Sequence, residues 1–166
     1  SKFYGETKAV YRAHLEAKDS EFVTILGPSG CGKSTTLRII AGLIRADEGR
    51  VYFDNRDVTD LPPNRRNIGF VFQRVALFPH MSVRKNIAFG LRARHFSDRE
   101  IRKKTKEVLA LVRMEGYEER APSQLSGGQS QRIEIARVLA TNPDVLLFDE
   151  PLSNIDAKLR DELKFE

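Results

Sequence analysis

The sequence has 166 residues, of which 40% are hydrophobic and 31% charged, so one core of ordinary size is expected and a disordered chain is excluded. No run approaches the roughly 18–20 apolar residues that cross a bilayer, and a single cysteine excludes an intrachain disulfide framework and favours a reducing compartment such as the cytoplasm. The 28 basic and 23 acidic residues give a net charge of +5, which suits nucleic acid, anionic lipid, a polyanionic nucleotide, or simply a solvated basic surface.

A strand, a loop and a helix are predicted in succession over residues 21–44. Residues 21–26 read EFVTIL, a short run rich in β-branched and aromatic types that is typical of a strand. Gly27 ends this run, and from Lys33 to Ile44 apolar side chains recur at helical spacing. A glycine-rich loop therefore joins a strand to a helix.

Two further strands and two further helices are predicted downstream. Residues 67–73 and 144–149 are short apolar runs that look like buried parallel strands. Between them, Ser97 and Glu100 have the spacing of a capping box, and an apolar face through Val112 predicts a helix. A second helix is predicted over residues 129–140. The basic residues of the first helix lie largely off its apolar face, where simple solvation explains them: Arg99, Arg102, Lys103, Lys104 and Lys106.

The loop Gly27–Ser34 fits the pattern G-x-x-x-x-G-K-[ST]. In such a loop consecutive backbone amides cradle phosphates, the lysine neutralises the β- and γ-phosphate oxygens, and the hydroxyl binds Mg²⁺, so Lys33 and Ser34 take the last two roles. The alternative is a tight structural turn. Cys31 fills an unrestricted position, where a small packing residue is expected and not a nucleophile. The predicted nucleotide-binding residues of this segment are Gly27, Ser29, Gly30, Cys31, Gly32, Lys33, Ser34 and Thr35.

A second set of polar residues follows the predicted strands. Asp149 and Glu150 end the apolar run 144–149, so one carboxylate can hold a metal ion and the next can orient an attacking water, as phosphoryl transfer requires. Gln73 ends the other run and can reach metal or water while remaining neutral. Taken alone, such acids are often a solvated strand end; with a phosphate loop upstream they predict a catalytic site.

The segment Leu125-Ser126-Gly127-Gly128-Gln129 is a second glycine-rich loop that opens a helix. Adjacent glycines are poor helix formers, so their place just before a periodic run suggests a backbone kept bare for the close approach of a ligand. The N-terminal amides of the helix would then face an anion.

These motifs occur in the order and approximate spacing of ATP-binding cassette (ABC) ATPases, which the chain resembles over essentially its whole length. Many unrelated nucleotidases have the phosphate loop and the strand-terminal acids, so the five-residue signature Leu125–Gln129 is the specific element. The Ser153-Asn154-Ile155-Asp156 segment completes the set. More narrowly, residues 57–63, 76–80 and 152–154 resemble the ATPase subunits of bacterial importers for sugars, polyamines or ferric iron.

The resemblance implies an α/β fold of the P-loop NTPase (RecA-like) type, with a parallel-sheet core, an N-terminal β portion and an inserted α-helical subdomain. The implied divisions are a nucleotide-binding core in residues 1–73, a helical subdomain in residues 74–141 that ends in the signature helix, and the core resumed in residues 142–166. The implied function is binding and hydrolysis of ATP with Mg²⁺ to power solute import, peripherally at the cytoplasmic face of the bacterial inner membrane.

In this family two ATPase units dimerise head to tail, and the signature of one unit closes over ATP held by the other. The resemblance therefore implies that Ser126, Gly127, Gly128 and Gln129 bind nucleotide in trans and that Asp156 lies at the dimer seam. Tyr4 matches the position that stacks on adenine, with Phe3 as a rival and a core aromatic as the alternative reading of Tyr4. The implied catalytic residues are Glu150, Gln73 and Lys33, and the implied Mg²⁺ ligands are Ser34, Gln73 and Asp149.

The importer resemblance also implies a surface for the membrane-embedded permease subunits. In the family a groove beside the segment Ala76–His80 receives a short cytoplasmic helix of the permease, which makes Leu77, Phe78 and Pro79 the candidate contacts. Internal packing is the alternative for each of these side chains. His80 is expected to be a loop residue making one hydrogen bond and not a catalytic base.

The sequence departs from the family pattern in two ways that matter. Family members carry a histidine at the end of the strand that follows the position of Asp156, whereas all three histidines here lie upstream of it. We therefore expect a fragment that lacks part of its sheet. Glu134 stands on the signature helix where alanine is usual, and it is expected either to pair with Arg137 one turn away or to disturb the packing.

Two other functions remain open at this stage. Soluble cassette ATPases of DNA repair, chromosome organisation and translation share the phosphate motifs and bind nucleic acid. The interval from Lys33 to Leu125 leaves no room for a long coiled coil, and one cysteine cannot build zinc modules, so nucleic acid is not expected as a partner. A fragment that binds nucleotide without hydrolysing it is the other alternative.

Overall fold

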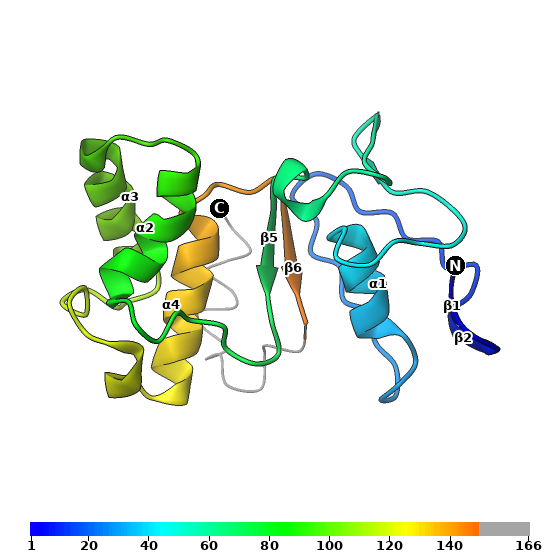
Figure 1. The fold of residues 1–166 in the computed structure, drawn as a ribbon, viewed down its shortest axis with the longest axis horizontal. Helices are drawn as coiled ribbons and strands as arrows, with labels where there is room; N and C mark the ends of the chain where they lie inside the picture. Colours follow the sequence, from blue (N-terminus) through cyan, green and yellow to red (C-terminus); the bar gives the residue numbers. More distant parts are fainter. Residues whose placement is uncertain (150–166) are drawn as a thin grey trace. The chain divides into compact units, whose positions relative to one another are not determined.

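The computed structural model describes residues 1–149, and the chain divides into two units, Ser1–Ile68 and Gly69–Glu166. In the first unit, strand β1 (Lys2–Tyr4) pairs antiparallel with β2 (Thr7–Val10), and β3 (Tyr52–Phe53) pairs antiparallel with β4 (Arg56–Asp57) (Figure 1). A 3₁₀ turn, η1, covers Pro63–Arg65. These hairpins form the N-terminal β portion that the sequence predicts.

The strand predicted over residues 21–26 is wrong for the described structure, in which this segment has no regular secondary structure. A parallel strand is stable only with hydrogen-bonded neighbours and covered faces. Within residues 1–149 no strand pairs with the segment, and its apolar side chains remain open, with Leu26 86% and Phe22 52% exposed. The apolar pattern of these residues is therefore present without the partners that would make it a strand.

Helix α1 (Lys33–Ile40) follows the phosphate loop, as predicted, but ends four residues before Ile44. Gly42 has a φ of 74°, which takes the chain out of the helix. The buried Arg66 then satisfies the helix end, because its guanidinium donates to the carbonyl oxygens of Ile39 (3.0 Å) and Ile40 (2.8 Å). A Cβ on residue 42 would lie 2.5 Å from Nε of Arg66, so only glycine allows this approach.

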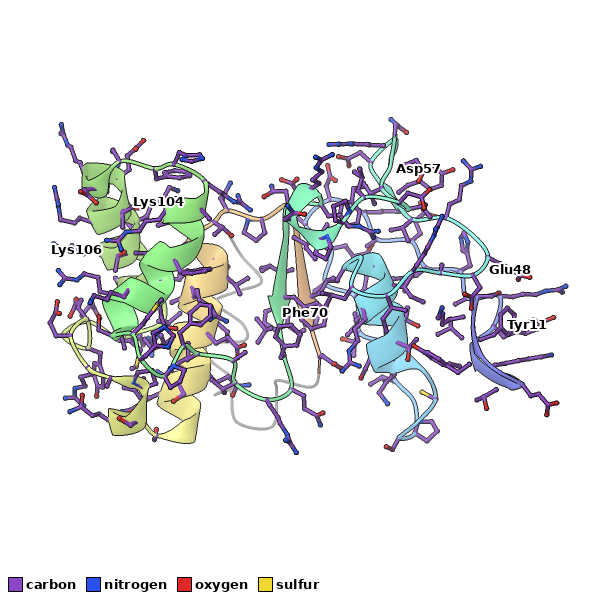
Figure 2. The ribbon with its side chains drawn as sticks, in the orientation of Figure 1. Tyr11, Glu48, Asp57, Phe70, Lys104 and Lys106 are labelled. Carbon is purple, nitrogen blue, oxygen red and sulfur yellow. The ribbon has the colours of Figure 1, made fainter. Side chains whose placement is uncertain are left out.

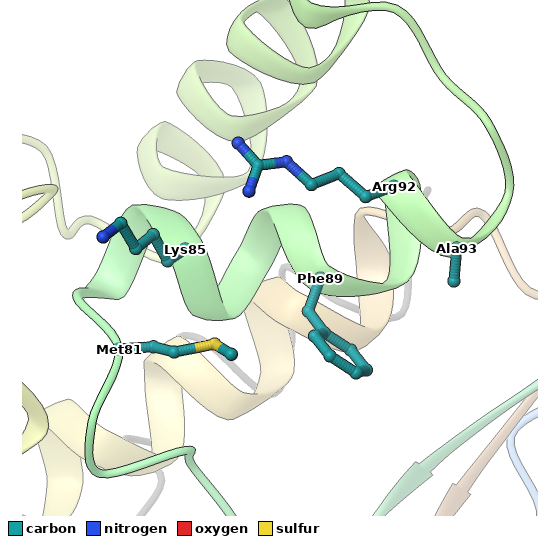
Figure 3. A pocket seen from close by; sticks show the side chains of 5 residues that line it. All are labelled: Met81, Lys85, Phe89, Arg92 and Ala93. Atoms are coloured by element: carbon teal, nitrogen blue, oxygen red, sulfur yellow. The ribbon is translucent and has the colours of Figure 1, made fainter.

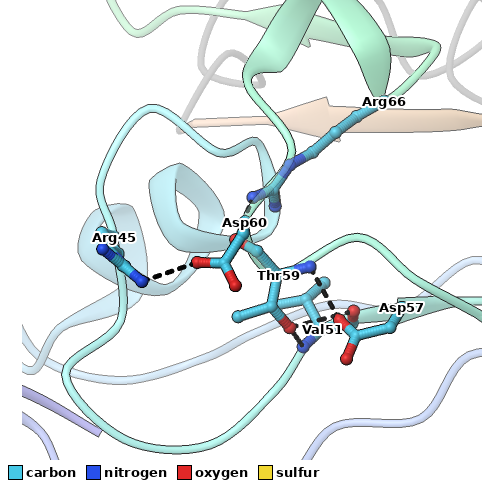
Figure 4. Close-up of polar contacts among 6 residues, drawn as sticks. All are labelled: Arg45, Val51, Asp57, Thr59, Asp60 and Arg66. Atoms are coloured by element: carbon cyan, nitrogen blue, oxygen red, sulfur yellow. Dashed lines mark hydrogen bonds and ion pairs between the residues drawn. The ribbon is translucent and has the colours of Figure 1, made fainter.

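Arg66 also ties the helix end to the loop that follows β4. Its guanidinium donates to the carbonyl oxygens of Thr59 (2.8 Å) and Leu61 (2.7 Å). Thr59 is itself held by the carboxylate of Asp57, which accepts its N–H at 2.9 Å, and by Val51, whose N–H donates to the Thr59 hydroxyl at 2.9 Å (Figure 4). The guanidinium therefore joins two segments that are far apart in sequence.

β5 (Ile68–Val71), which lies in the second unit except for its first residue, and β6 (Val145–Phe148) lie side by side and run in the same direction (Figure 1). Both strands were predicted, within runs 67–73 and 144–149. Gly69 lies at the contact between the strands and a helix, because an added Cβ would overlap the side chain of Val138 and lie 2.8 Å from that of Leu146.

Up to residue 149, the second unit also contains the helices α2 (Val83–Ala93), α3 (Asp98–Leu111) and α4 (Gly127–Leu139), with a 3₁₀ turn η2 at Pro122–Gln124. α4 lies between the two strands and the pair α2 and α3 (Figure 1). The core between the helices is built from their apolar faces, chiefly Ile87, Leu91, Ile101, Leu109, Ile133 and Ile135.

The predicted helix after Ser97 is confirmed together with its capping box. The Ser97 hydroxyl accepts the Glu100 N–H, and the Glu100 carboxylate accepts the Ser97 N–H at 2.8 Å. Ile101, Val108 and Leu109 are buried, as the periodicity requires. Lys106 is exposed, and Lys104 places its ammonium 5.6 Å from the Phe96 ring, so these two members of the basic set are solvent-facing or stacked side chains of α3 (Figure 2).

Among the described residues, no helix has both the length and the apolar character needed to cross a membrane.

Candidate functional site

The glycine-rich loop before α1 is an exposed segment that ends in a left-handed residue. Gly32 is the N-cap of the helix with a φ of 96°, and a Cβ there would overlap the carbonyl oxygen of Ala9. Gly30 also has a positive φ, of 81°, but an added Cβ would meet no atom within 4 Å. Because α1 has no acidic residue in its first turn, the positive end of its dipole is left for an external anion.

Lys33 is the first residue of α1, and its side chain folds back over the loop. The ammonium donates to the carbonyl oxygens of Gly27 (2.9 Å) and Pro28 (3.0 Å) and lies 3.9 Å from the sulfur of Cys31. These contacts hold the Lys33 ammonium against the start of the loop. Phosphate oxygens can replace the neutral carbonyl oxygens there as its hydrogen-bond acceptors. Cys31 is exposed, whereas a small packing residue was expected at this position.

Polar residues gather where β5 and β6 end. Asp149 follows β6 directly, is 3% exposed, and donates its N–H to the carbonyl oxygen of Val71 at 3.0 Å. Gln73 lies two residues beyond Val71 and is exposed. The carboxyl ends of the two parallel strands therefore bring the predicted metal ligand Asp149 to the same edge as Gln73. Glu150 and Asp156 lie outside the described residues.

The signature segment forms a second capping box, at the start of α4. The Ser126 hydroxyl accepts the Gln129 N–H at 3.3 Å, and the Gln129 side-chain oxygen accepts the Ser126 N–H at 2.9 Å. The Gln129 amide also donates to the Tyr117 hydroxyl at 3.2 Å. Gln129 therefore holds Ser126 in place, and the polar groups of its side chain are engaged within the chain.

Gly127 differs from the glycines that close packing requires. It has no positive φ, and outside its own helix backbone an added Cβ would meet no atom of the described residues within 4 Å, whereas at Gly32, Gly42 and Gly69 it would meet atoms at distances that require a shift. The fold of the described residues therefore does not explain the glycine at position 127. Free space above a helix N-terminus with no acidic residue in its first turn suits the approach of an anion from outside.

Tyr4 ends β1 and is 52% exposed, so the alternative of a core aromatic does not hold for it. Its neighbour Phe3 is half-buried and contacts the edge of the Tyr11 ring, with centroids 6.4 Å apart. Of the two rivals, Tyr4 is the more exposed, although the Lys2 ammonium lies over its ring, 5.5 Å from the centroid.

The loop predicted to meet a partner is organised by a buried asparagine that the sequence did not single out. Asn86 on α2 is fully buried; its side chain accepts the N–H of Phe78 (2.8 Å) and donates to the carbonyl oxygens of Phe78, Met81 and Ser82 (3.1 Å each). Leu77 packs against the helical core, so internal packing holds for this residue, whereas Pro79 is exposed.

A hollow of about 330 Å³ lies on α2 beside this loop, lined by Met81, Lys85, Phe89, Arg92 and Ala93 (Figure 3). Phe89 is 47% exposed, and its ring lies 4.6 Å from that of Phe78. Sequence reasoning missed this surface. Its signal was available, since Phe89 is an aromatic residue two positions from Ile87, off the apolar face that Ile87 and Leu91 mark.

The donor set matches Mg²⁺ by its chemistry. Ser34, Gln73 and Asp149 offer a hydroxyl, an amide oxygen and a carboxylate, which are the hard oxygen ligands that Mg²⁺ takes together with phosphate oxygens. Within residues 1–149 there is no group of three or more His, Cys, Asp and Glu side chains that could hold a metal ion by themselves. By their chemistry alone, these three side chains would suit an Mg²⁺ that phosphate oxygens also bind.

Comparison with known proteins decides the family. The family model described as ABC transporter matches residues 10–153, which is most of the chain. The chain belongs to this family. The resemblance drawn from the sequence motifs is thereby confirmed.

Curated relatives narrow the comparison to import ATP-binding proteins. The chain is 51% identical over its whole length to the spermidine/putrescine import ATP-binding protein PotA of Thermotoga maritima, covering 45% of that protein. It is 48% identical over 98% of its length to the Fe(3+) ions import ATP-binding protein FbpC of Fusobacterium nucleatum, covering 44% of it, and 52% identical over 99% of its length to the sulfate/thiosulfate import ATP-binding protein CysA of Bacillus cereus, covering 47% of it. The chain therefore spans about half the length of the curated relatives it matches.

Solved structures support the fold class. The dimeric structure of MJ0796, a bacterial ABC transporter cassette, matches with a TM-score of 0.79 and 41% identity, over 90% of this chain and 68% of that one. A post-hydrolysis state of the same cassette, bound to ADP and phosphate, matches equally well. The predicted α/β P-loop fold with a parallel sheet and a helical insertion is confirmed. The individual roles of the site residues and the three-part domain division stay predictions.

Proposed function

We propose that this chain is part of an ATP-binding and ATP-hydrolysing subunit that powers solute import across a bacterial cytoplasmic membrane. The observation that supports it best is the placement of the motifs, with a phosphate loop opening α1, polar residues at the ends of β5 and β6, and a glycine-rich signature opening α4. The three relatives reported above are named as import ATP-binding proteins, which favours this function over a nucleic-acid or ribosome partner.

ATP is the proposed substrate of the loop Gly27–Ser34. The ammonium of Lys33 exchanges its contacts with loop carbonyls for the β- and γ-phosphate oxygens, a stronger charge-assisted pairing. The amides at the start of α1 bind the remaining phosphate oxygens, and Thr35 lies in the same first turn. Tyr4 offers its exposed ring to the adenine.

Ser34, Gln73 and Asp149 are the proposed ligands of the Mg²⁺ that accompanies ATP. When bound, this ion withdraws charge from the phosphate groups and so favours attack on the γ-phosphorus. Glu150 is the proposed base that orients the attacking water, and Gln73 holds that water or the metal through a neutral amide. Lys33 stabilises the charge that develops on the phosphoryl oxygens.

A second copy or a homologous ATPase unit is the proposed first partner. Ser126, Gly127 and Gly128 of one unit bind ATP held by the other, with Gln129 keeping Ser126 at the helix cap. The open space around Gly127, which the described fold leaves unused, supports this role. Asp156 is proposed to lie at the seam of the dimer.

Permease subunits are the proposed second partner, which places the protein at the cytoplasmic face of the membrane. The proposed contact surface consists of Phe78, Pro79 and the hollow around Phe89, with Leu77 supporting it from inside. Met81 and Phe89 offer apolar contacts, while Lys85 and Arg92 supply positive charge (Figure 3). Such a surface fits a short helix with an apolar face and an acidic flank.

The similarity to these relatives does not identify the imported solute. PotA, FbpC and CysA are named for polyamines, ferric ions and sulfate, yet their identities to the chain lie between 48% and 52%. A cytoplasmic ATPase binds the permease and not the solute, so its surface carries no direct record of the cargo.

The test uses the full-length protein that contains this chain. Lys33→Ala is expected to weaken ATP binding at least about tenfold, because the charge-assisted hydrogen bonds from the ammonium to the phosphate oxygens are lost. Glu150→Gln is expected to retain ATP binding and lose hydrolysis. Unchanged ATP affinity in Lys33→Ala, or normal turnover in Glu150→Gln, would overturn the proposed site, and purification with a ribosome or DNA in place of membrane subunits would overturn the importer function.

A further inference from the structure

Two side chains of α4 hold a single residue of the loop that follows Gln73. The carboxylate of Glu134 accepts the N–H of Ala76 at 3.2 Å, and the guanidinium of Arg137 donates to the carbonyl oxygen of the same residue at 2.8 Å. Glu134 and Arg137 lie one helical turn apart, with 3.8 Å between Oε1 and Nη2. Both polar backbone groups of Ala76 are therefore bound by one carboxylate–guanidinium pair.

Burying the carboxylate of Glu134 at this position costs free energy of folding. Its side chain is fully buried, and among residues 1–149 no group forms a hydrogen bond with its second oxygen, Oε2. Burial raises the pKa of Glu134, against the opposing effects of the Ala76 amide, the Arg137 charge and the Phe72 amide. The family pattern has alanine here, so the carboxylate is not needed to form the helix. A residue that costs stability and departs from its family is a candidate for a functional role.

The clamped residue lies between two sites of the proposed function. Ala76 is three residues after Gln73 and two before Phe78. The Arg137 guanidinium lies 5.4 Å from the centroid of the Phe78 ring, and that ring contacts Phe89 in the hollow on α2. The other end of α4 begins at the Ser126 cap. The same helix therefore has the signature serine at its start and, near its end, the two side chains that bind the loop at Ala76.

We propose that Glu134 and Arg137 form a clamp that positions Gln73 by fixing Ala76 to the signature helix. A displacement at Phe78 or Phe89 is then passed to Gln73 through Ala76, and Gln73 moves together with Ser126. Glu134 and Arg137 are positioning residues, since neither is proposed to touch nucleotide. The clamp rests on the proposed ATPase function and adds to it a link specific to this chain.

The test compares four variants in the full-length protein, with ATP and Mg²⁺ as the only ligands. Glu134→Gln keeps the volume and an acceptor for the Ala76 N–H but removes the charge that faces Arg137. Arg137→Met removes the donor to Ala76, and Arg137→Lys restores a cation that can reach it. Glu107→Gln is the matched control, because it breaks a carboxylate–cation pair with Lys103 of the same 3.8 Å separation on the exposed face of α3.

We expect kcat to fall roughly threefold to thirtyfold in Glu134→Gln and Arg137→Met, the usual range for a coupling residue without ligand contact. The KM for ATP should change less than about twofold, since Lys33 is untouched, and Arg137→Lys should recover most of the loss. The control should turn over at the wild-type rate. In a Gln73→Ala background, Glu134→Gln should have no further effect on kcat, because the clamp acts through Gln73.

Each other outcome overturns a defined part of the proposal. Wild-type kcat in both clamp variants, or an equal loss with and without Gln73, overturns the clamp. A loss of melting temperature with unchanged kcat per folded molecule shows a purely structural role and also overturns it. If the wild-type protein itself hydrolyses no ATP, the proposed function fails and the clamp fails with it; if Lys33→Ala abolishes hydrolysis while the clamp variants are normal, only the clamp is lost.

Discussion

Replacing Arg66 should release the end of the helix that carries Lys33. The guanidinium is 4% exposed and donates to four carbonyl oxygens at 2.7–3.0 Å, two of them in the last turn of α1. Burial lowers the pKa of Arg66, so the cost of desolvating the cation offsets part of these bonds. Arg66→Met leaves all four carbonyls without this donor.

The expected loss follows from the hydrogen bonds. At about 1 kcal/mol net each, four bonds give about 4 kcal/mol, and relaxation of the freed carbonyls toward water reduces this to about 3–4 kcal/mol. A free energy of that size corresponds to roughly two to three orders of magnitude in the opening equilibrium of α1. Arg66→Lys should lose about half as much, because a single ammonium keeps the favourable charge at the helix end but cannot span both segments.

Amide hydrogen exchange of α1 peptides in the full-length protein measures this local opening directly. Arg45→Met is the matched control, since Arg45 pairs with Asp60 at 2.8 Å but both side chains are more than two-thirds exposed (Figure 4); its loss should stay below about 0.5 kcal/mol. Exchange of α1 in Arg66→Met within about threefold of wild type, or an equal effect of Arg45→Met, would refute the assignment of the helix end to these four bonds.

Three further expectations concern the second unit. Gly127→Ala should leave the free energy of unfolding unchanged or raise it by up to about 1 kcal/mol, while it lowers ATP turnover. Gly69→Ala should instead lower the free energy of unfolding by about 1–3 kcal/mol, because the added methyl group overlaps with Val138. Denaturant unfolding and ATPase assays distinguish the two variants, and a loss of stability in Gly127→Ala would contradict the reasoning. Asn86→Ala should cost about 3 kcal/mol in urea unfolding because one acceptor and two donors of a buried amide are lost, and a cost under about 1 kcal/mol would show that the loop does not depend on it. Burial raises the pKa of Glu134 above its ordinary value of 4.5, so above pH 4.5 the native state binds more protons than the unfolded state, and stability falls as pH rises up to the pKa in the fold. The unfolding midpoint of Glu134→Gln relative to wild type should therefore rise from pH 4 to pH 8, and a pH-independent difference would show that the carboxylate is not desolvated.

Local patterns were sufficient to predict several elements. The capping box of Ser97 and Glu100, and the strands β5 and β6, were predicted because their signals depend on residues close in sequence. The run 21–26 has the same kind of apolar pattern and forms no strand within the described residues. A strand needs partners from elsewhere in the chain, so its pattern predicts less than a helix cap does.

Contacts between distant segments were beyond the reach of the sequence. The sequence did not single out Asn86, and only the fold shows that its side chain accepts the N–H of Phe78, eight residues away. Leu77, a candidate partner contact, packs against the helical core, whereas Phe89, which the sequence did not single out, is 47% exposed. Helical periodicity predicts which positions share a face, but not which neighbours cover a loop.

The sequence by itself determined the family and the order of its chemical groups. The glycine patterns, Lys33, Gln73 and the strand-terminal acids are local motifs, and the phosphate chemistry that they predict depends on residue type and spacing alone. Tertiary structure decided what each residue contacts. It showed Gly32, Gly42 and Gly69 to be required by close packing and Gly127 to be free of it, because the space around a Cβ depends on segments far away in the chain. It also showed that Glu134, which the sequence marks only as an unusual residue on a helix, is buried and contacts Ala76 and Arg137.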